Sequence, residues 1–447
     1  MSGGTRRWKP YPAYKDSGVK WLGQVPEGWE VMSLKRKLRV VSGTTPKTQE
    51  ASYWGDDHIW ITPADLGKSD KFYLTDSITK ISNDGLVNCG LQLVPSGSII
   101  ISIRAPIGSL GIAKLAMCTN QGCKSLILLK EYSSEFLAYF LSSVTNELNM
   151  LGAGSTFKEL SGEKLGSFLF PVPSYDEQRA IATFLDQQCA QIDALITNKR
   201  RMLELLDEKR RAIITQAVTR GLDPSVPLKD SGVEWLGQVP EGWEVKRLKF
   251  CVSSGFQYGA NIAAELDDTN LPRYIRITDM NDDGTLKDET FRSLPVEEAA
   301  PYILRDKDIL LARSGATVGK SFIYYESMGS AAYAGYLIRI AVSKDLSSRY
   351  IYAFLNSQSY WQWIGSVFIQ ATIQNVSAEK YANFTMTVPP LAEQRAIADY
   401  LDAQTAALDA QRESLEKSID LLREYRASLI THAVTGKIDV RDFVPVR

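Results

Sequence analysis

Residues 16–31 read DSGVKWLGQVPEGWEV, and residues 230–245 repeat this string as DSGVEWLGQVPEGWEV, with the single change of Lys20 to Glu234. A match of this length, rich in Trp and Gly, is not a chance event, and self-similarity at a fixed distance is the signature of an internal duplication. The two strings begin 214 residues apart. The chain is therefore built from two copies of one frame.

A second repeated motif lies near the other end of each copy. The hexapeptide EQRAIA occupies residues 177–182 and recurs at 393–398, 216 residues later, each time after a proline-containing segment. Between the motifs the copies diverge, although SEFLAYFLSS at 134–143 still parallels SRYIYAFLNS at 348–357. The order of constant motif, variable segment and constant motif, repeated once, indicates one frame that carries two different contents.

The segments that begin with EQRAIA are predicted to be long helices. Apolar residues recur at alternating steps of four and three from Ile181 and again from Ile397, which is the pattern of a coiled-coil seam. Gly221 and Gly436 are candidate helix ends. The predicted seam comprises Ile181, Leu185, Ile192, Leu195, Met202 and Leu206 in the first helix, and Ile397, Leu401, Leu408, Leu415, Leu422 and Leu429 in the second.

Two arrangements of these helices are compatible with the pattern. Each helix could pack only on its own domain, or the two could pair antiparallel and hold the variable segments at opposite ends. About 40 helical residues would then span roughly 60 Å, which suits two DNA half-sites one helical turn or more apart. We favour the helix pair, and we expect Gln188 to lie opposite its repeat equivalent, Gln404, as a polar pair that sets the register.

The variable segments, 30–170 and 244–387, contain short β-like runs followed by polar, glycine-rich loops. We predict an α+β domain for each segment. Arg104 and Arg313 both follow such a run and precede a glycine turn, so they are expected to occupy equivalent places in the two copies.

The side chains of these loops include the types that hydrogen-bond to base edges. Arg pairs with guanine and Asn or Gln with adenine in the major groove, although any one such residue is more often an ordinary turn residue. The candidate DNA contacts are Thr44, Thr45, Lys47, Arg104 and Lys158 in the first segment, and Gln257, Tyr258, Arg276, Arg313, Gln370, Thr372 and Gln374 in the second.

No catalytic signature is found. The string SGATVGKS at 314–321 resembles a phosphate-binding loop, but Gly315 leaves three residues before Gly319 where the motif needs four. The residues that follow read as a strand, whereas phosphate would require a helix N-terminus. Two histidines, His58 and His432, do not suffice for a His-rich metal site, and no tetrapeptide typical of amino-methyltransferases occurs. The sequence therefore predicts neither an active site nor a metal.

Composition sets wider bounds. A chain of 447 residues with 44% hydrophobic and 23% charged residues is typical of a globular protein of two or three domains. The five cysteines form no CxxC pair, and no apolar run is long enough to cross a membrane, so we expect a cytoplasmic protein with reduced thiols. A net charge of −1 is unlike that of simple nucleic-acid binders, which are usually basic.

These motifs resemble the specificity subunits of type I restriction-modification enzymes. The resemblance rests on the WLGQVPEGWEV strings at 21–31 and 235–245, on the Pro-x-x-x-EQRAIA strings that begin at Pro173 and Pro389, and on the glycine-turn loops. It covers essentially the whole chain.

The resemblance implies an α+β fold with two pseudo-repeated α/β target-recognition domains, separated by two long helices that form an antiparallel coiled coil. The expected division is an N-terminal conserved segment at 1–28, target-recognition domains at 29–173 and 243–390, a central helix at 174–220, a repeated linker at 221–242, and a C-terminal helix and tail at 391–447.

The resemblance also implies a non-catalytic subunit that reads a bipartite, asymmetric site in double-stranded DNA, one half per domain. The helices would act as a spacer and bind two methylation subunits, which hold S-adenosylmethionine. Two translocase-nuclease subunits, with ATP and Mg²⁺, would complete the complex. No cofactor is expected in this chain, and partners that clamp the DNA would account for its weakly negative charge.

Two other functions stay open. The chain could be a duplicated coiled-coil scaffold that binds protein partners without reading DNA, or a nucleotide-binding enzyme that depends on Lys320. The scaffold hypothesis does not explain why the frame is copied so closely while the two domains differ.

Overall fold

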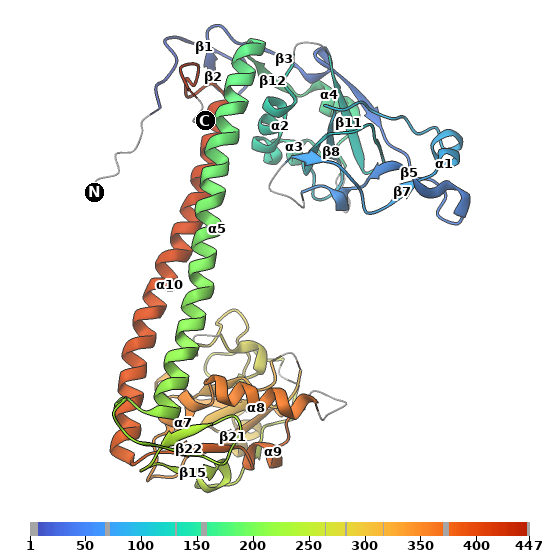
Figure 1. Ribbon diagram of the computed structural model, residues 1–447. Coiled ribbons are helices and arrows are strands. Elements are labelled where there is room, and N and C mark those ends of the chain that lie inside the picture. The colour runs from blue at the N-terminus through green and yellow to red at the C-terminus, as the bar shows by residue number, and fades with distance from the viewer. Residues whose placement is uncertain are drawn as a thin grey trace. The chain divides into compact units, whose positions relative to one another are not determined.

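The structure is a computed structural model that describes residues 8–67, 72–129, 132–152, 159–263, 265–281, 284–315, 317–369 and 375–444. The chain forms two compact units. Unit 1 comprises Met1–Asn198 and Ser418–Arg447, and unit 2 comprises Lys199–Lys417. Each unit holds one variable domain and one end of each of two long helices, α5 (Tyr175–Arg220) and α10 (Leu391–Val434) (Figure 1). The α+β fold class is confirmed.

The domain of unit 1 is built on a five-stranded sheet. Its strand order is β4-β11-β8-β9-β6, and only the β6–β9 pair is parallel. The strands of this sheet are β4 (Leu38–Ser42), β6 (Tyr73–Leu74), β8 (Ile99–Ser102), β9 (Leu110–Ala113) and β11 (Cys123–Leu128). The other elements are β1 (Tyr14–Asp16), β2 (Gln24–Pro26), β3 (Glu30–Ser33), β5 (Trp54–Ile61), β7 (Lys80–Ile81), β10 (Cys118–Thr119), β12 (Leu169–Val172), α1 (Asn83–Asn88), α2 (Ser134–Ser143), α3 (Thr145–Leu151) and α4 (Gly162–Ser167).

The domain of unit 2 repeats this plan with four strands in the main sheet, in the order β16-β21-β18-β19. These strands are β16 (Gln257–Tyr258), β18 (Ile309–Ala312), β19 (Ser321–Ile323) and β21 (Leu337–Ile340). The other elements are β13 (Leu228–Asp230), β14 (Gln238–Pro240), β15 (Glu244–Arg247), β17 (Arg273–Ile275), β20 (Ala331–Tyr333), β22 (Thr385–Val388), α6 (Val296–Ala299), α7 (Ser348–Phe354), α8 (Gln358–Ile369) and α9 (Ala378–Ala382).

The repeated WLGQVPEGWEV motif receives the C-terminal end of a long helix in each unit. Gly436, with φ of +72°, follows α10, and a Cβ there would lie 2.3 Å from Cδ of Pro26 in the first motif. Gly221, with φ of +78°, follows α5 and packs on Trp243 of the second motif. The prediction that these two glycines end the helices is confirmed. Glycine suits both places because L side chains rarely adopt this conformation.

The glutamine of each EQRAIA motif ties the start of its helix to the domain. Gln178 accepts a hydrogen bond from the backbone N–H of Ser133 (2.9 Å) and donates one to the carbonyl oxygen of Pro173 (3.0 Å). Gln394 makes the same two bonds, to Ser347 (2.9 Å) and Pro389 (2.7 Å). Both glutamines are buried, and a buried amide left unpaired would be costly. The two copies therefore join helix and domain in the same way.

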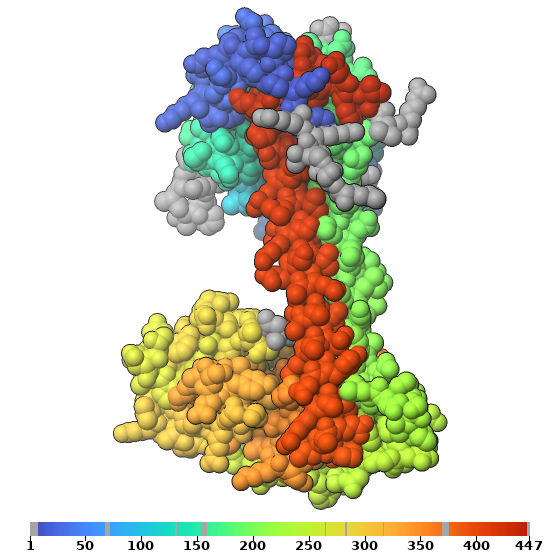
Figure 2. Space-filling model, turned by 90° about the vertical axis from the view of Figure 1, so that its left-hand side faces the viewer, coloured from blue at the N-terminus to red at the C-terminus, as the bar shows by residue number. Residues whose placement is uncertain are grey.

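The first and the last described segments of the chain lie together in unit 1. The backbone N–H of Asp439 donates to the carbonyl oxygen of Lys9 (2.7 Å), and the rings of Trp8 and Phe443 both contact Phe184 of α5. Figure 2 shows the blue N-terminal segment beside the red C-terminal segment.

All five cysteines are free thiols, as predicted. Burial raises the pKa of Cys118 and of Cys123 to about 12, which keeps both protonated.

Candidate nucleic-acid interface

The helices α5 and α10 pack antiparallel, and ion pairs join them in both units. In unit 1, Nε of Arg426 lies 3.0 Å from Oδ1 of Asp193. In unit 2, Arg210 pairs with Asp409 and Arg412 pairs with Asp207. The side chains of these pairs are partly buried, which reduces solvent screening relative to fully exposed pairs. The expectation that the helices pair is confirmed.

The prediction that Leu195 and Met202 lie in the seam between the helices is wrong. Leu195 and Met202 are 50% and 52% exposed, whereas the next residues, Ile196 and Leu203, are buried and half-buried. Both places offer two consecutive apolar residues, so the spacing alone does not say which one faces the partner helix. The other ten predicted seam residues, Ile181, Leu185, Ile192, Leu206, Ile397, Leu401, Leu408, Leu415, Leu422 and Leu429, are buried or half-buried.

The expected pairing of Gln188 with Gln404 is also wrong. In unit 1 the antiparallel register of the Asp193–Arg426 ion pair places Gln188 level with Thr431. In unit 2 the register of Arg210 with Asp409 places Gln404 level with Thr215. Each glutamine thus lies level with a threonine of the other helix, because the antiparallel pairing brings the start of each helix beside the end of the other.

Residues of both helices form an apolar groove on the helix pair in unit 2. The groove, of about 430 Å³, is lined by Met202, Leu205, Leu206, Lys209, Gln411, Ser414 and Leu415. Met202 and Leu205 are about half exposed.

Several candidate DNA contacts of the first domain come together at one end of the main sheet. Thr45 donates a hydrogen bond to the side chain of Gln121, and Thr44 is held by its backbone N–H on the carbonyl oxygen of Thr119 (3.0 Å). Arg104 lies on the neighbouring strand end and pairs with Glu159 (3.2 Å), with both side chains about half exposed. We call Thr44, Thr45, Arg104 and Gln121 cluster 1, whereas the carbonyl oxygen of Lys47 accepts a hydrogen bond from the backbone N–H of Glu50 (3.1 Å) and Lys47 is not part of the cluster. Lys158 lies outside the described residues.

The second domain carries a different group at the same end of its sheet. The guanidinium of Arg313 lies over the ring of Tyr258, at 4.7 Å from its centroid, and its buried Nε bonds to no described atom. The buried Oδ1 of Asn375 has no described partner either, and a backbone bridge joins Asn375 to Ser314.

Gln257 and Tyr258, which lie next to Arg313, each accept a hydrogen bond from elsewhere in the domain. Gln257 accepts a hydrogen bond from Arg339 (2.9 Å), and the hydroxyl of Tyr258 accepts one from the backbone N–H of Ala378 (3.1 Å). We call Gln257, Tyr258, Arg313 and Asn375 cluster 2. Gln370, Thr372 and Gln374 lie outside the described residues.

Arg276 is bound within its own domain. Its guanidinium contacts Asp279 through Nε (3.1 Å) and Nη2 (2.9 Å) and donates to the carbonyl oxygen of Thr290 (2.7 Å), and Asp279 is buried. In the same turn of unit 1, the hydroxyl of Thr62 donates a hydrogen bond to the carboxylate of Asp65 (2.6 Å). The bonds of Arg276 therefore build a turn of the frame, and we exclude it from cluster 2.

Arg104 and Arg313 are not equivalent, contrary to expectation. The backbone N–H and C=O of Arg313 bond to Tyr336 (3.0 Å) and Val376 (2.8 Å), and in unit 1 these two bonds belong to Ile103, not to Arg104. The place of Arg104 is taken by Ser314, since both form the isolated bridge to the strand that follows. The loop after β18 is one residue longer than the loop after β8, and this insertion hides the correct alignment in the sequence.

Two glycines beside the clusters, Gly43 and Gly259, were not predicted from the sequence. A Cβ on Gly43 would lie 2.1 Å from the carbonyl oxygen of Asn120, and one on Gly259 would lie 2.3 Å from that of Tyr333. The two glycines are 216 residues apart, the offset of the EQRAIA motif. That shared offset is the signal that could have found them. Each lets the strand that carries its cluster lie directly against the neighbouring strand.

Ser321 begins β19 and Lys320 directly precedes it, so the phosphate-loop-like string leads into a strand, as expected. Among the described residues, no group of three or more His, Cys, Asp or Glu side chains is placed to hold a metal ion. None of the described helices is long and apolar enough to cross a membrane.

A duplicated frame with paired helices and two unlike polar clusters defines a protein with two recognition domains. The chain matches the model of the type I restriction modification DNA specificity domain twice, over residues 26–205 and 240–417, and belongs to that family. It is a DNA specificity subunit with two target-recognition domains.

Individual relatives agree with this assignment, and solved structures share the fold. The chain is 30% identical over 307 residues to the type I restriction enzyme MjaIX specificity subunit of Methanocaldococcus jannaschii, covering 66% of this chain and 68% of that protein. It is 23% identical to the StySPI specificity subunit of Salmonella potsdam, covering 93% and 90%. The fold is similar to that of the HsdS subunit from Thermoanaerobacter tengcongensis, with a TM-score of 0.54, 15% identity and coverage of 95% and 100%.

The fold also matches a chain from a structure entitled "Structural basis underlying complex assembly and conformational transition of the type I R-M system". The TM-score is 0.72 at 15% identity, covering 93% of this chain and 99% of the other.

Proposed function

We propose that each target-recognition domain reads one half of a bipartite, asymmetric site in double-stranded DNA. The observation that carries this proposal is the contrast between clusters 1 and 2. At the same end of the main sheet, unit 1 has Thr45 bonded to Gln121, whereas unit 2 has Arg313 over the ring of Tyr258. A frame kept constant while its hydrogen-bonding side chains change fits two readers of different base sequences.

The chemistry of cluster 2 suits direct contact with bases. An Arg guanidinium with donors to spare pairs in a bidentate manner with guanine, and Asn pairs with adenine. Tyr258 supplies a flat face under the guanidinium of Arg313, which limits the conformations of this long side chain. Cluster 1 offers Thr45, Gln121 and Arg104 instead, so we expect it to read different bases.

The chain acts without chemistry of its own in this proposal. Methylation of adenine and cleavage of DNA take place on partner subunits, which hold S-adenosylmethionine, ATP and Mg²⁺. A net charge of −1 provides little non-specific attraction for phosphates, so partner subunits supply part of the grip on the DNA. Such a complex works in the cytoplasm, where the chromosome is accessible.

The apolar groove on the helix pair is proposed to bind a methylation subunit. Its residue Leu205 in unit 2 has its repeat equivalent in Leu421, which is 65% exposed in unit 1. These two exposed leucines, one in each unit, fit two methylation subunits, and translocase-nuclease subunits would join the resulting complex. An apolar face of a partner helix is the occupant that such a groove favours.

The experiment that tests the proposal is co-expression of this chain with its methylation subunit, followed by single-molecule sequencing to map modified adenines. We expect one motif with two specified halves and an unspecified gap. A stable complex that modifies no adenine and binds no DNA would contradict the proposal and favour a protein scaffold.

A further inference from the structure

The main sheets of the two units differ at one edge. In unit 1, β6 pairs in parallel with β9 and forms the outer strand. The backbone N–H of Ile112 donates to the carbonyl oxygen of Phe72 (2.7 Å), and that of Lys114 donates to Leu74 (2.9 Å). In unit 2 the sheet ends at β19, the equivalent of β9.

The backbone groups that hold β6 in unit 1 are present in unit 2. Ile323 pairs with Ile309 of β18 as Ile112 pairs with Ile99 of β8, so Ile323 and Tyr325 take the places of Ile112 and Lys114. Between them, the N–H of Tyr324 points into the sheet and bonds to Asp308 (2.8 Å). Because N–H groups alternate in direction along a strand, those of Ile323 and Tyr325 point outward. No strand of the described residues pairs with this side of β19.

The chain segment that corresponds to β6 forms a hairpin in unit 2 instead of an outer strand, and Gly284 of this hairpin lines the hollow described below. In unit 1, β6 begins at Tyr73, eight residues after the turn at Pro63–Asp65 ends. In unit 2 the corresponding turn, Ile277–Asp279, is followed by a hairpin in which Met280 bridges to Leu286 and the N–H of Lys287 returns to Asp279 (2.8 Å). The segment is thereby used in its own hairpin.

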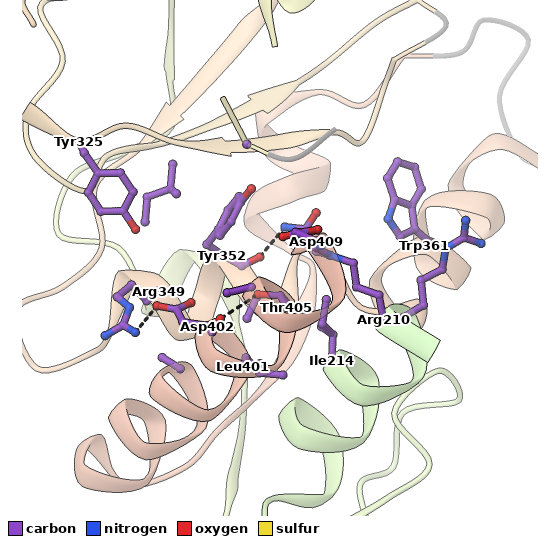
Figure 3. A pocket seen from close by; sticks show the side chains of 17 residues that line it. Arg210, Ile214, Tyr325, Arg349, Tyr352, Trp361, Leu401, Asp402, Thr405 and Asp409 are labelled. Atoms are coloured by element: carbon purple, nitrogen blue, oxygen red, sulfur yellow. Dashed lines mark hydrogen bonds and ion pairs between the residues drawn. The ribbon is translucent and has the colours of Figure 1, made fainter. Parts of the chain in front are cut away.

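A hollow of about 450 Å³ lies beside the open edge. Its lining includes Ile323, Tyr325, Tyr352, Ala353 and Trp361 (Figure 3). Figure 3 shows Tyr325, Tyr352 and Trp361 around α5 and α10 in unit 2.

In unit 1 aromatic side chains fill the corresponding place. The ring of Phe72, at the start of the outer strand, meets that of Tyr139 edge-on at 5.0 Å, and the hydroxyl of Tyr139 donates to Asp186 (2.8 Å). Counted from the serine that bonds to the EQRAIA glutamine in each unit, Ala353 stands where Tyr139 stands. Unit 2 therefore lacks both aromatic rings.

Four of the five charged side chains that line the hollow form ion pairs, and the fifth is Arg211. Arg349 is bound by Asp399 (2.8 Å) and Asp402, and Arg210 is bound by Asp409. Burial, and then the charge of Asp402, raise the pKa of Tyr325, so its hydroxyl stays neutral. An uncharged aromatic side chain fits such a lining better than an ion.

We propose that the open edge of β19 takes an extended segment of a partner protein as a fifth strand, with a Phe or Tyr side chain of that segment in the hollow. Strand addition to a free sheet edge is a general mode of peptide recognition, in which backbone hydrogen bonds give affinity and a side-chain pocket gives specificity. It also covers an edge that would otherwise favour aggregation. The inference rests on the proposed function only in supposing that the chain works in a complex with protein partners.

Hydrogen exchange of single backbone amides tests this inference on the full chain. The probe is a capped peptide, FYLTD, with the sequence of residues 72–76. We expect exchange at Ile323 and Tyr325 to slow by about tenfold or more when the peptide is added, and again when methylation subunits are bound. Ile112 and Lys114 are the matched control, because β6 already covers them, and their exchange should not change.

Filling the hollow gives a second measurement. Ala353→Trp should abolish the protection of Ile323 and Tyr325 by the peptide. Ala403→Trp, at an exposed alanine of α10 outside the hollow, should leave that protection intact. Thermal unfolding of both variants shows whether either has lost its fold, and the exchange data on the unaltered chain do not depend on them.

Each outcome decides the proposal. Unchanged exchange at Ile323 and Tyr325, with peptide and in the complex, overturns it. Protection by the peptide without protection in the complex overturns the claim that a partner uses this edge. If no complex with methylation subunits forms, the proposed function fails, and the peptide measurement alone decides whether the edge binds an extended segment.

Discussion

Oδ1 of Asp193 in α5 lies 3.0 Å from Nε of Arg426 in α10, and the repeat equivalents of these residues, Asp409 and Arg210, form the same ion pair in unit 2. The acid comes from α5 in unit 1 and from α10 in unit 2, so the two helices exchange roles between the units. The duplication thus preserved specific contacts between the helices as well as the motifs at their ends.

Breaking this ion pair should weaken the helix packing. We expect Asp193→Asn to lower the free energy of unfolding by about 1 kcal/mol, since the side chains of the pair are mostly buried and moderately screened. Asp420→Asn is the matched control, because Asp420 pairs with Arg423 on the surface of one helix, where the effect should be close to zero. Urea unfolding measures both. Equal effects of the two substitutions would contradict the importance of the pair between helices.

Gly259 should not tolerate a side chain. A Cβ would lie 2.3 Å from the carbonyl oxygen of Tyr333, which belongs to the backbone and cannot turn away. We expect Gly259→Ala to destabilise the chain by about 1–3 kcal/mol and to impair recognition of one half-site. Gly242→Ala, where no atom lies within 4 Å of the added Cβ, is the control. A Gly259→Ala chain as stable as the Gly242→Ala chain would show that the strands separate easily.

Arg313 should determine part of one half-site. Arg313→Ala is expected to weaken discrimination at one base position of the second half by about 1–3 kcal/mol, the value of a bidentate contact. Competition between DNA duplexes altered at single positions measures it. Uniform weakening on all sequences would instead indicate a phosphate contact. Arg276→Ala serves as the comparison, because Arg276 is bound to the buried Asp279, and its loss should lower stability and leave the motif unchanged.

The apolar sites on the helix pair, one in each unit, should each bind one methylation subunit independently of the other. Leu205→Glu places a charge in the groove of unit 2 and should remove one of the two subunits, because a buried unpaired charge is costly. Leu205→Glu with Leu421→Glu should remove both. Gln216→Glu adds the same charge at an exposed position of α5 and should remove neither. Native mass spectrometry counts the subunits, and full occupancy of the double variant would exclude this surface.

The duplication and the long helices could be predicted from sequence, because a near-identical string and a sustained three-four spacing leave few alternatives. The side of α5 that faces α10 could not be predicted from sequence, since Leu195 and Ile196 are both apolar and only packing selects between them. The equivalence of Ile103 and Arg313 was hidden by a one-residue insertion in the loop after β18. Arg276 looked available for DNA because its partner, Asp279, is recognisable only once the turn is folded.

The measurement that tests the central claim most directly is an exchange of one recognition domain. Residues 30–170 are replaced by the equivalent segment of a relative that recognises a different site, with the exchange points in the β3–β12 pair that closes the domain. Modified adenines are then mapped by single-molecule sequencing. The account predicts that one half of the recognised motif changes, while the other half and the gap stay as they were. A change in both halves, or in neither, would contradict the claim that each domain reads its own half-site.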